Sequence, residues 1–147
     1  MPENMLPDNM PTETQIVALM ALPLDAPVAV LNMFRFRERA KYNEGDPEYG
    51  SEAANISGQE AMARYSEAAG AFLTGLGGHV EFNAPVDQIM IGPEAPTWHV
   101  TAIMYFPTRA AFVKMLNDPA FQHASRHRKA ALDGHYMLHL DGSAFTV

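Results

Sequence analysis

The stretch PVAVLNMFRF, Pro27 to Phe36, constrains the fold more than any other part of the chain. Its β-branched and aromatic residues are apolar on both faces, which is typical of a central strand that is covered on both sides. A chain of 147 residues can bury such a strand in one domain. We therefore expect residues 11–147 to form a single domain, after a flexible N-terminal arm of residues 1–10 that is rich in Pro, Asn and acidic residues.

Helix and strand signals alternate along the rest of the chain. Ser57-x-x-Glu60 is a capping box that begins a helix, and Gly77-Gly78 ends it. The other expected helices are Glu13–Leu22 with Thr12 as its cap, Thr108–Leu116, and Asp118–Leu132, which Gly134 ends. The other expected strands are His79–Asn83, Val86–Ile91, Thr97–Phe106 and His135–Leu140. A long surface loop, Arg37–Ile56, follows the first strand.

The order of these elements is a βαββαβ plan in which the second helix is a pair. Such a chain is an α+β protein that folds as a ferredoxin-like antiparallel sheet with its helices on one face. The other face is bare, and His99, Ile103 and Tyr105 or their neighbours make it too apolar for a solvated surface. We therefore expect a second subunit's sheet to cover it in a homodimer.

Composition excludes several functions. The formal net charge of -7 argues against a nucleic-acid partner, because phosphate binding needs basic surface. The chain has no cysteine, which excludes disulfides, thiol catalysis and Cys-ligated metal centres and fits the reducing cytoplasm, where we expect the protein. The first basic residue is Arg35, which argues against a secretory signal. The apolar run Ile16–Leu24 is too short to span a membrane, so no membrane partner is expected.

Five segments of the chain carry a family resemblance. They are VAVLNMFRFRERAKY, SGQEAMARYSEAAGAFL, GGHVEF, YFPTRAAFVKMLNDPAFQ and HRKAAL. In order and spacing, over roughly Thr12 to Leu140, they resemble the family catalogued as domain of unknown function 1330. This family is similar in fold to the dimeric α+β barrels, in which two ferredoxin-like sheets pair face to face. That superfamily includes cofactor-independent monooxygenases, muconolactone-type isomerases, haem-dependent chlorite dismutases and proteins with no known activity.

The resemblance implies the fold and the dimer, and it carries over no established catalytic residues. The residues here that match the family's motifs are Asn32, Arg35, Tyr65, Pro107, His127 and Arg128. A functional hypothesis therefore has to come from the chemistry of the residues themselves, because one fold hosts many functions.

Cationic residues form two clusters, which the topology places at one end of the sheet. They are Arg35, Arg37, Arg39 and Lys41 after the first strand, and Arg126, Arg128 and Lys129 in the last helix. A site there would hold a carboxylate or enolate in the fork of an arginine, with histidine as a proton carrier. Solvated cations that pair with loop acids or with the helix dipole are the alternative. Helix phase puts His127 and Arg128 on or beside the buried stripe, whereas Arg126 and Lys129 point outward.

Seven residues are candidates for the site. Arg35 and Arg128 would bind the anion, His127 or His99 would transfer a proton, Asn32 and Tyr65 would orient the ligand, and Trp98 would line the site beside His99. Five of them have a structural alternative. His127 and Arg128 would support the 37–56 loop, His99 would lie in the dimer interface, Asn32 would satisfy nearby backbone groups, and Tyr65 would belong to the core.

His123 and His127 lie four residues apart on a helix, a spacing that suits two metal ligands, but no third ligand is evident. No Gly-rich phosphate loop follows a strand. We therefore expect neither a metal nor a cofactor. The sequence indicates a homodimer that binds a small apolar metabolite with a carboxylate or carbonyl group, and leaves cofactor-independent monooxygenase or isomerase activity open. The alternative is a non-catalytic ligand-binding or structural dimer, so the sequence does not decide whether the protein is an enzyme.

Overall fold

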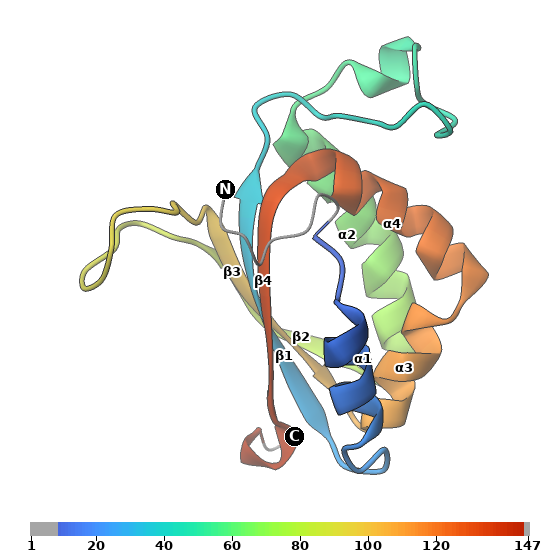
Figure 1. Cartoon of the computed structure of the whole chain (residues 1–147), viewed down its shortest axis with the longest axis vertical. Helices are drawn as coiled ribbons and strands as arrows, with labels where there is room; N and C mark the ends of the chain where they lie inside the picture. Colours follow the sequence, from blue (N-terminus) through green and yellow to red (C-terminus); the bar gives the residue numbers. More distant parts are fainter. Residues whose placement is uncertain (1–8, 146–147) are drawn as a thin grey trace.

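The sheet has four antiparallel strands in the order β2-β3-β1-β4, in a computed structural model that describes residues 9–145. The strands are β1 (Val28–Phe36), β2 (His79–Pro85), β3 (Val100–Phe106) and β4 (Leu132–Asp141). Helices α2 (Gly58–Gly75), α3 (Arg109–Leu116) and α4 (Pro119–Ala131) lie on one face of the sheet, as Figure 1 shows. The expected ferredoxin-like α+β fold is confirmed, and β1 lies inside the sheet as expected.

The α-helices begin at the caps that the sequence predicts. These caps are Thr12 for α1 (Glu13–Met20), Ser57 for α2, Thr108 for α3 and Asp118 for α4. Each side chain accepts a hydrogen bond from a backbone N–H of the first turn, a donor that the helix itself leaves unsatisfied. Two 3-10 helices, η1 (Glu52–Ala54) and η2 (Gly142–Ala144), follow β1 and β4.

The face of the sheet beneath the helices is the inward face, and it forms the core. Val28 and Val30 of β1 pack with Phe106 of β3 and with Phe112 and Phe121 from the helices. A second cluster lies toward the C-terminal end of β1 and includes Phe34, Tyr42, Ala61, Met62, Ala131 and Leu132. Because side chains alternate along a strand, the same register that buries these residues turns their neighbours to the other face.

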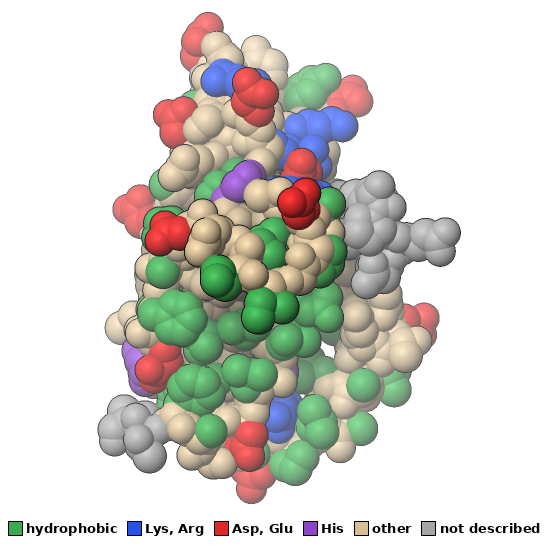
Figure 2. All heavy atoms as spheres, turned by 90° about the vertical axis from the view of Figure 1, so that its left-hand side faces the viewer, with side chains coloured by type: hydrophobic (Ala, Val, Ile, Leu, Met, Phe, Trp, Pro, Cys, Tyr) green, Lys and Arg blue, Asp and Glu red, His purple; other side chains and the backbone are tan. Residues whose placement is uncertain are grey.

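That other face, the open face, carries apolar side chains in register. Its three central rows are Ala29, Tyr105 and Leu140; Leu31, Ile103 and Leu138; and Met33, Thr101 and Tyr136. Phe82, Tyr136 and Leu138 are 43%, 44% and 41% exposed. Figure 2 looks at this side of the molecule and shows hydrophobic side chains gathered across it. The prediction that Ile103 and Tyr105 lie on a face without helices is confirmed.

Two element predictions were wrong. Val86–Ile91 is not a strand, because β3 begins only at Val100 and residues 87–98 have no neighbouring strand within the described residues. Gly134 does not end the last helix, because α4 stops at Ala131 and β4 starts at the next residue. The carbonyl groups of Ala130 and Ala131 instead accept hydrogen bonds from the backbone of the loop after β1, which replaces a glycine cap.

The N-terminal part of the described chain lies against the helices. Helix α1 has no buried residue, and Val17 is 64% exposed. The carbonyl groups of Leu24 and Ala26 accept hydrogen bonds from the first N–H groups of α3. Of the arm expected over residues 1–10, all but Asn9 and Met10 lie outside the described residues. Among residues 9–145 no helix combines the length and the apolar character that crossing a bilayer requires.

Candidate functional site

The two cationic clusters share one end of the sheet, as predicted. The backbone N–H of Arg37 donates to the carbonyl of Ala131 at 2.8 Å, and that of Lys41 donates to Ala130 at 2.9 Å. The loop after β1 is thus fixed to the C-terminal end of α4. The side chains of the two clusters nevertheless separate, because consecutive residues of α4 point in different directions.

A chain of polar groups, of which Asn32 and Arg128 are buried and His135 is partly buried, crosses the core beneath this end. Arg128 of α4 donates from Nη1 to Nδ1 of His135 at 3.2 Å, and Nε2 of His135 lies 2.8 Å from Oδ1 of Asn32 on β1. Asn32 donates from Nδ2 to Sδ of Met104 at 3.1 Å and to the carbonyl of Val30 at 3.4 Å. Asn32 is 3% exposed and Arg128 is 8% exposed. These three residues, the Arg128–His135–Asn32 chain, therefore join a helix to two strands inside the protein.

The partners of His135 fix its tautomer. Arg128 can only donate, so Nδ1 of His135 accepts, and Nε2 carries the proton that it donates to Asn32. Burial and, to a smaller extent, the positive charge of Arg128 together lower the pKa of His135 to about 3. His135 is therefore neutral at neutral pH, and its one acceptor nitrogen is held by Arg128.

The surroundings of this chain are largely apolar. The rings of His135 and Phe34 lie 4.8 Å apart between centroids. Tyr65 of α2 is partly buried against the core side chains. Burial raises the pKa of its hydroxyl, while the charge of Arg128 acts on that pKa in the opposite direction. Arg128 also donates from Nη1 to the carbonyl of Asn9 and from Nη2 to Sδ of Met10, both at 3.2 Å. The N-terminal segment thus lies directly against the guanidinium group.

His127 has a different neighbour from Arg128. Its Nδ1 lies 2.6 Å from the hydroxyl of Tyr42, a buried residue of the loop after β1. Nη1 of Arg64 donates to the same hydroxyl at 3.3 Å. Burial is the largest cause that lowers the pKa of His127, and the charge of Arg126 is the second. His127 therefore joins the loop after β1 to α4 through a hydrogen bond with Tyr42, whereas Arg128 bonds to His135.

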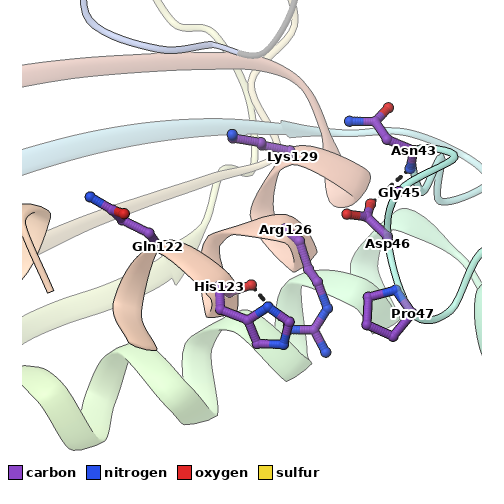
Figure 3. Close-up of a pocket in the computed structure, with 8 residues that line it drawn as sticks. All are labelled: Asn43, Gly45, Asp46, Pro47, Gln122, His123, Arg126 and Lys129. Atoms are coloured by element: carbon purple, nitrogen blue, oxygen red, sulfur yellow. Dashed lines mark hydrogen bonds between the residues drawn. The ribbon is translucent and has the colours of Figure 1, made fainter. Parts of the chain in front are cut away.

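Arg126, which the sequence places on the solvated side, is mostly covered. Its Nε and Nη2 donate to the two carboxylate oxygens of Glu48 at 2.9 and 2.8 Å, and its side chain is only 18% exposed. The side-chain hydrogen bond from Arg126 lowers the pKa of Glu48 to about 2. Arg126 also lines a pocket of about 290 Å³. Figure 3 shows the side chains around this pocket. It is lined by Asn43, Gly45, Asp46, Pro47, Gln122, His123, Arg126 and Lys129.

Three further candidates lie away from the buried chain. Arg35 pairs with Asp133 at 2.7 Å. His99 accepts a hydrogen bond at Nδ1 from the backbone N–H of Phe36 at 2.9 Å and stacks on its ring. Trp98 lies near Tyr136 of the open face, with 6.4 Å between ring centroids. The structure thus brings together Asn32, Arg128 and Tyr65, and it separates them from Arg35, His99, Trp98 and His127.

His135 is the member of the buried chain that sequence reasoning missed. We treated it as the first residue of a short final strand, but β4 begins at Leu132, and His135 is opposite Phe34 on the inward face. A signal that could have identified His135 is that it is a titratable residue opposite the buried aromatic residue Phe34. Within residues 9–145 no three His, Asp or Glu side chains come close enough together to hold a metal ion.

Residues 51–140 match the family described as Domain of unknown function (DUF1330). The chain belongs to the DUF1330 family. No curated protein matches the chain. The DUF1330 match begins after β1, so Asn32 lies outside it, whereas His135, Arg128 and Tyr65 lie within it.

Solved structures agree with the fold of this DUF1330 protein. A protein of unknown function from Rhodopseudomonas palustris is 31% identical, with 90% of this chain and 94% of that chain covered and a TM-score of 0.78. The hydroxynitrile lyase of Passiflora edulis is 11% identical, with 79% and 93% covered and a TM-score of 0.51. An uncharacterized NIPSNAP domain protein from Burkholderia xenovorans is 12% identical, with 82% and 98% covered and a TM-score of 0.50. The last two are similar in fold only.

Proposed function

We propose that this DUF1330 protein is a cytoplasmic homodimer that binds a small apolar metabolite with a carboxylate or carbonyl group. The ligand site is the Arg128–His135–Asn32 chain, between the sheet and the helices. One observation carries the proposal: a buried arginine and a neutral histidine meet in an apolar interior. Ligand sites combine apolar walls with a few convergent polar groups of this kind.

The N-terminal segment supports the proposal because Asn9 and Met10 both contact the guanidinium group of Arg128. A carboxylate can accept two parallel hydrogen bonds from a guanidinium group. Helix α1, which follows this segment, has no buried residue and is thus held by few core contacts. Displacement of Asn9 and Met10 would admit a ligand whose carboxylate takes their place on Arg128.

Binding of an anion would also change His135. A ligand carboxylate would draw the Arg128 donor away from Nδ1 of His135 and would offset the charge that lowers the pKa of the imidazole. Asn32 would continue to hold the proton on Nε2, so Nδ1 would become a free base beside the ligand. Removal of a proton next to a carbonyl is the step that a cofactor-independent oxygenase or an isomerase would need, and Tyr65 would lie at the edge of that site.

A structural network is the second candidate function, and a specific observation favours it. Both ring nitrogens of His135 and the side-chain oxygen of Asn32 already have partners within the chain. A fully satisfied buried network of this kind joins α4, β4 and β1 without any ligand. Ligand titration separates the two functions, because only the first predicts that a carboxylate binds at Arg128.

The open face is the surface through which the proposed homodimer would form. Leu31, Ile103 and Leu138 form an apolar row on it, and no helix of the described residues covers them. A two-fold axis would place this row against its own copy, which suits a self-complementary apolar surface. Leu138→Glu should shift the protein to monomers in sedimentation, whereas Val17→Glu, an equally drastic change on the exposed side of α1, should leave the dimer intact.

Calorimetric titration tests the ligand site. The panel pairs carboxylates that carry a phenyl or alkyl body with the corresponding primary amides, against wild type, Arg128→Met and Lys129→Met. Lys129 is the matched control because it is the next cation on the same helix and lines the separate surface pocket. We expect carboxylates to bind wild type and Lys129→Met, and Arg128→Met to bind them about tenfold to a hundredfold more weakly, the range for a hydrogen bond to a charged group. Equal affinity of all three proteins for every compound would refute the site.

A further inference from the structure

The connection between β2 and β3 projects from the molecule. Residues 86–98, the 86–98 arm, leave the sheet on the side opposite the helices, as Figure 1 shows. Its tip carries three consecutive apolar residues. Ile89 is 40% exposed, Met90 is 80% exposed and Ile91 is 94% exposed. No other large hydrophobic side chain in the described part of the protein is as exposed as those of Met90 and Ile91.

The base of the arm is fixed to the sheet. The backbone N–H of Val86 donates to the carbonyl of His99 at 2.9 Å, which closes the arm across its two ends. His99 is held in turn by β1, since its N–H donates to the carbonyl of Phe34 at 2.8 Å and its ring accepts from the N–H of Phe36. The direction in which the arm leaves the sheet is therefore set by the contacts of its base with β1 rather than by its tip.

The arm is continuous with the open face. Trp98, at its C-terminal end, lies beside Tyr136, and Tyr136 is in register with Met33 on that face. Figure 2 shows hydrophobic side chains across the same side of the molecule that the arm points toward in Figure 1. A partner that covers the open face would therefore meet the arm as well.

The chemistry of the arm favours a second copy of this chain over a lipid surface. The arm contains Asp87 and Glu94 and no Lys or Arg. Segments that lie on membranes carry basic residues beside their apolar ones, because lipid headgroups are often anionic. A second copy offers an apolar surface of the kind that already surrounds the base of the arm, and a two-fold axis allows both arms to bind in the same way.

We propose that the 86–98 arm reaches across the homodimer interface and packs Ile89, Met90 and Ile91 on the partner subunit. This inference rests on the homodimer of the proposed function. It explains why the segment has the apolar β-like sequence of a buried strand although no strand among residues 9–145 of its own chain pairs with it. The side chains that this chain leaves in water are then buried by its copy.

The absence of cysteine makes a direct test possible. A single cysteine introduced as Met90→Cys and labelled with a maleimide photo-crosslinker reports what the tip touches. Glu67→Cys, at an exposed position on the helix side, is the matched control. A second variant, Ile89→Ser with Met90→Ser and Ile91→Ser, is compared with wild type by sedimentation at several concentrations. Both experiments use the full-length protein.

We expect a crosslinked dimer from Met90→Cys and none from Glu67→Cys, with the crosslink mapped to residues of the other copy. We expect the triple serine variant to raise the dimer dissociation constant about tenfold or more, because three large apolar side chains lose their burial. A wild-type dimer that gives no crosslink between subunits and is unchanged by the serines overturns the arm inference and leaves the dimer standing. A wild-type protein that sediments as a monomer overturns both.

Discussion

Replacement of His135 by glutamine removes the titrating group from the Arg128–His135–Asn32 chain while keeping a donor and an acceptor on the side chain. The structure assigns His135 a pKa of about 3 in place of the ordinary 6.5, chiefly because it is buried. Between these two values the unfolded chain binds a proton that the folded chain does not. The contribution of neutral His135 to stability is therefore complete above about pH 6.5 and is lost as pH falls toward 3.

The size of this loss can be worked out, because the free energy of unfolding falls by about 1.36 kcal/mol for each pH unit over which the unfolded chain binds one more proton than the folded chain. Between pH 7 and pH 5, protonation of His135 in the unfolded chain should lower the free energy of unfolding by about 2 kcal/mol. Urea unfolding at both pH values, with one fixed protein concentration, measures this loss in wild type and in His135→Gln. The difference in unfolding free energy between the two proteins should change by about 2 kcal/mol over this range.

Other histidines do not affect the comparison of the pH dependence of stability between wild type and His135→Gln. His127 and His139 also have lowered pKa values because of burial, but they titrate equally in wild type and His135→Gln, so that their contributions cancel. His123→Gln changes an exposed histidine of α4 and should follow wild type at both pH values. If the curves of wild type and His135→Gln run parallel between pH 7 and pH 5, His135 is not a buried neutral residue and the electrostatic description of the site is wrong.

Three further predictions concern the elements that position the site. Gly58→Ala should cost about 2 kcal/mol or more of unfolding free energy, because the added Cβ would lie 2.1 Å from a backbone carbonyl, whereas Gly70→Ala in the same helix has open space and should stabilise; thermal unfolding measures both. Ser57→Ala should cost about 1 kcal/mol through loss of the α2 cap, and equal stability in urea would contradict the capping box. Glu48→Gln removes the charged partner of Arg126, so amide hydrogen exchange in the loop after β1 should become faster, and unchanged exchange would refute a role for this pair in holding the loop.

Much of the fold could be predicted because its signals are local. The strand β1 and the capping box at Ser57 depend on residues within a few positions of one another, and both are where the sequence places them. The end of α4 depends instead on the loop after β1, whose N–H groups satisfy the last carbonyls of the helix. The prediction of a strand over Val86–Ile91 was wrong for a similar reason, since an apolar pattern does not reveal whether a neighbouring strand exists.

The residues of the candidate site were harder to predict, because their partners come from distant parts of the sequence. Helix phase placed His127 and Arg128 together near the buried stripe, but the first meets Tyr42 of the loop and the second meets His135 of β4. Sequence periodicity defines a direction around a helix and not the element that fills that direction. Asn32 was recognisable as a polar interruption of an apolar strand, yet its partner is more than a hundred residues away in sequence.

The central claim is that the Arg128–His135–Asn32 chain is a ligand site as well as a structural connection. Mass spectrometry of small molecules retained by the protein purified from its host tests this most directly, with wild type, Lys129→Met and Arg128→Met prepared in parallel and each shown to be folded by circular dichroism. We predict that wild type and Lys129→Met retain the same apolar carboxylate or carbonyl compound and that Arg128→Met retains none of it. Identical small-molecule content in the three proteins would contradict the claim and leave the buried chain with a structural role alone.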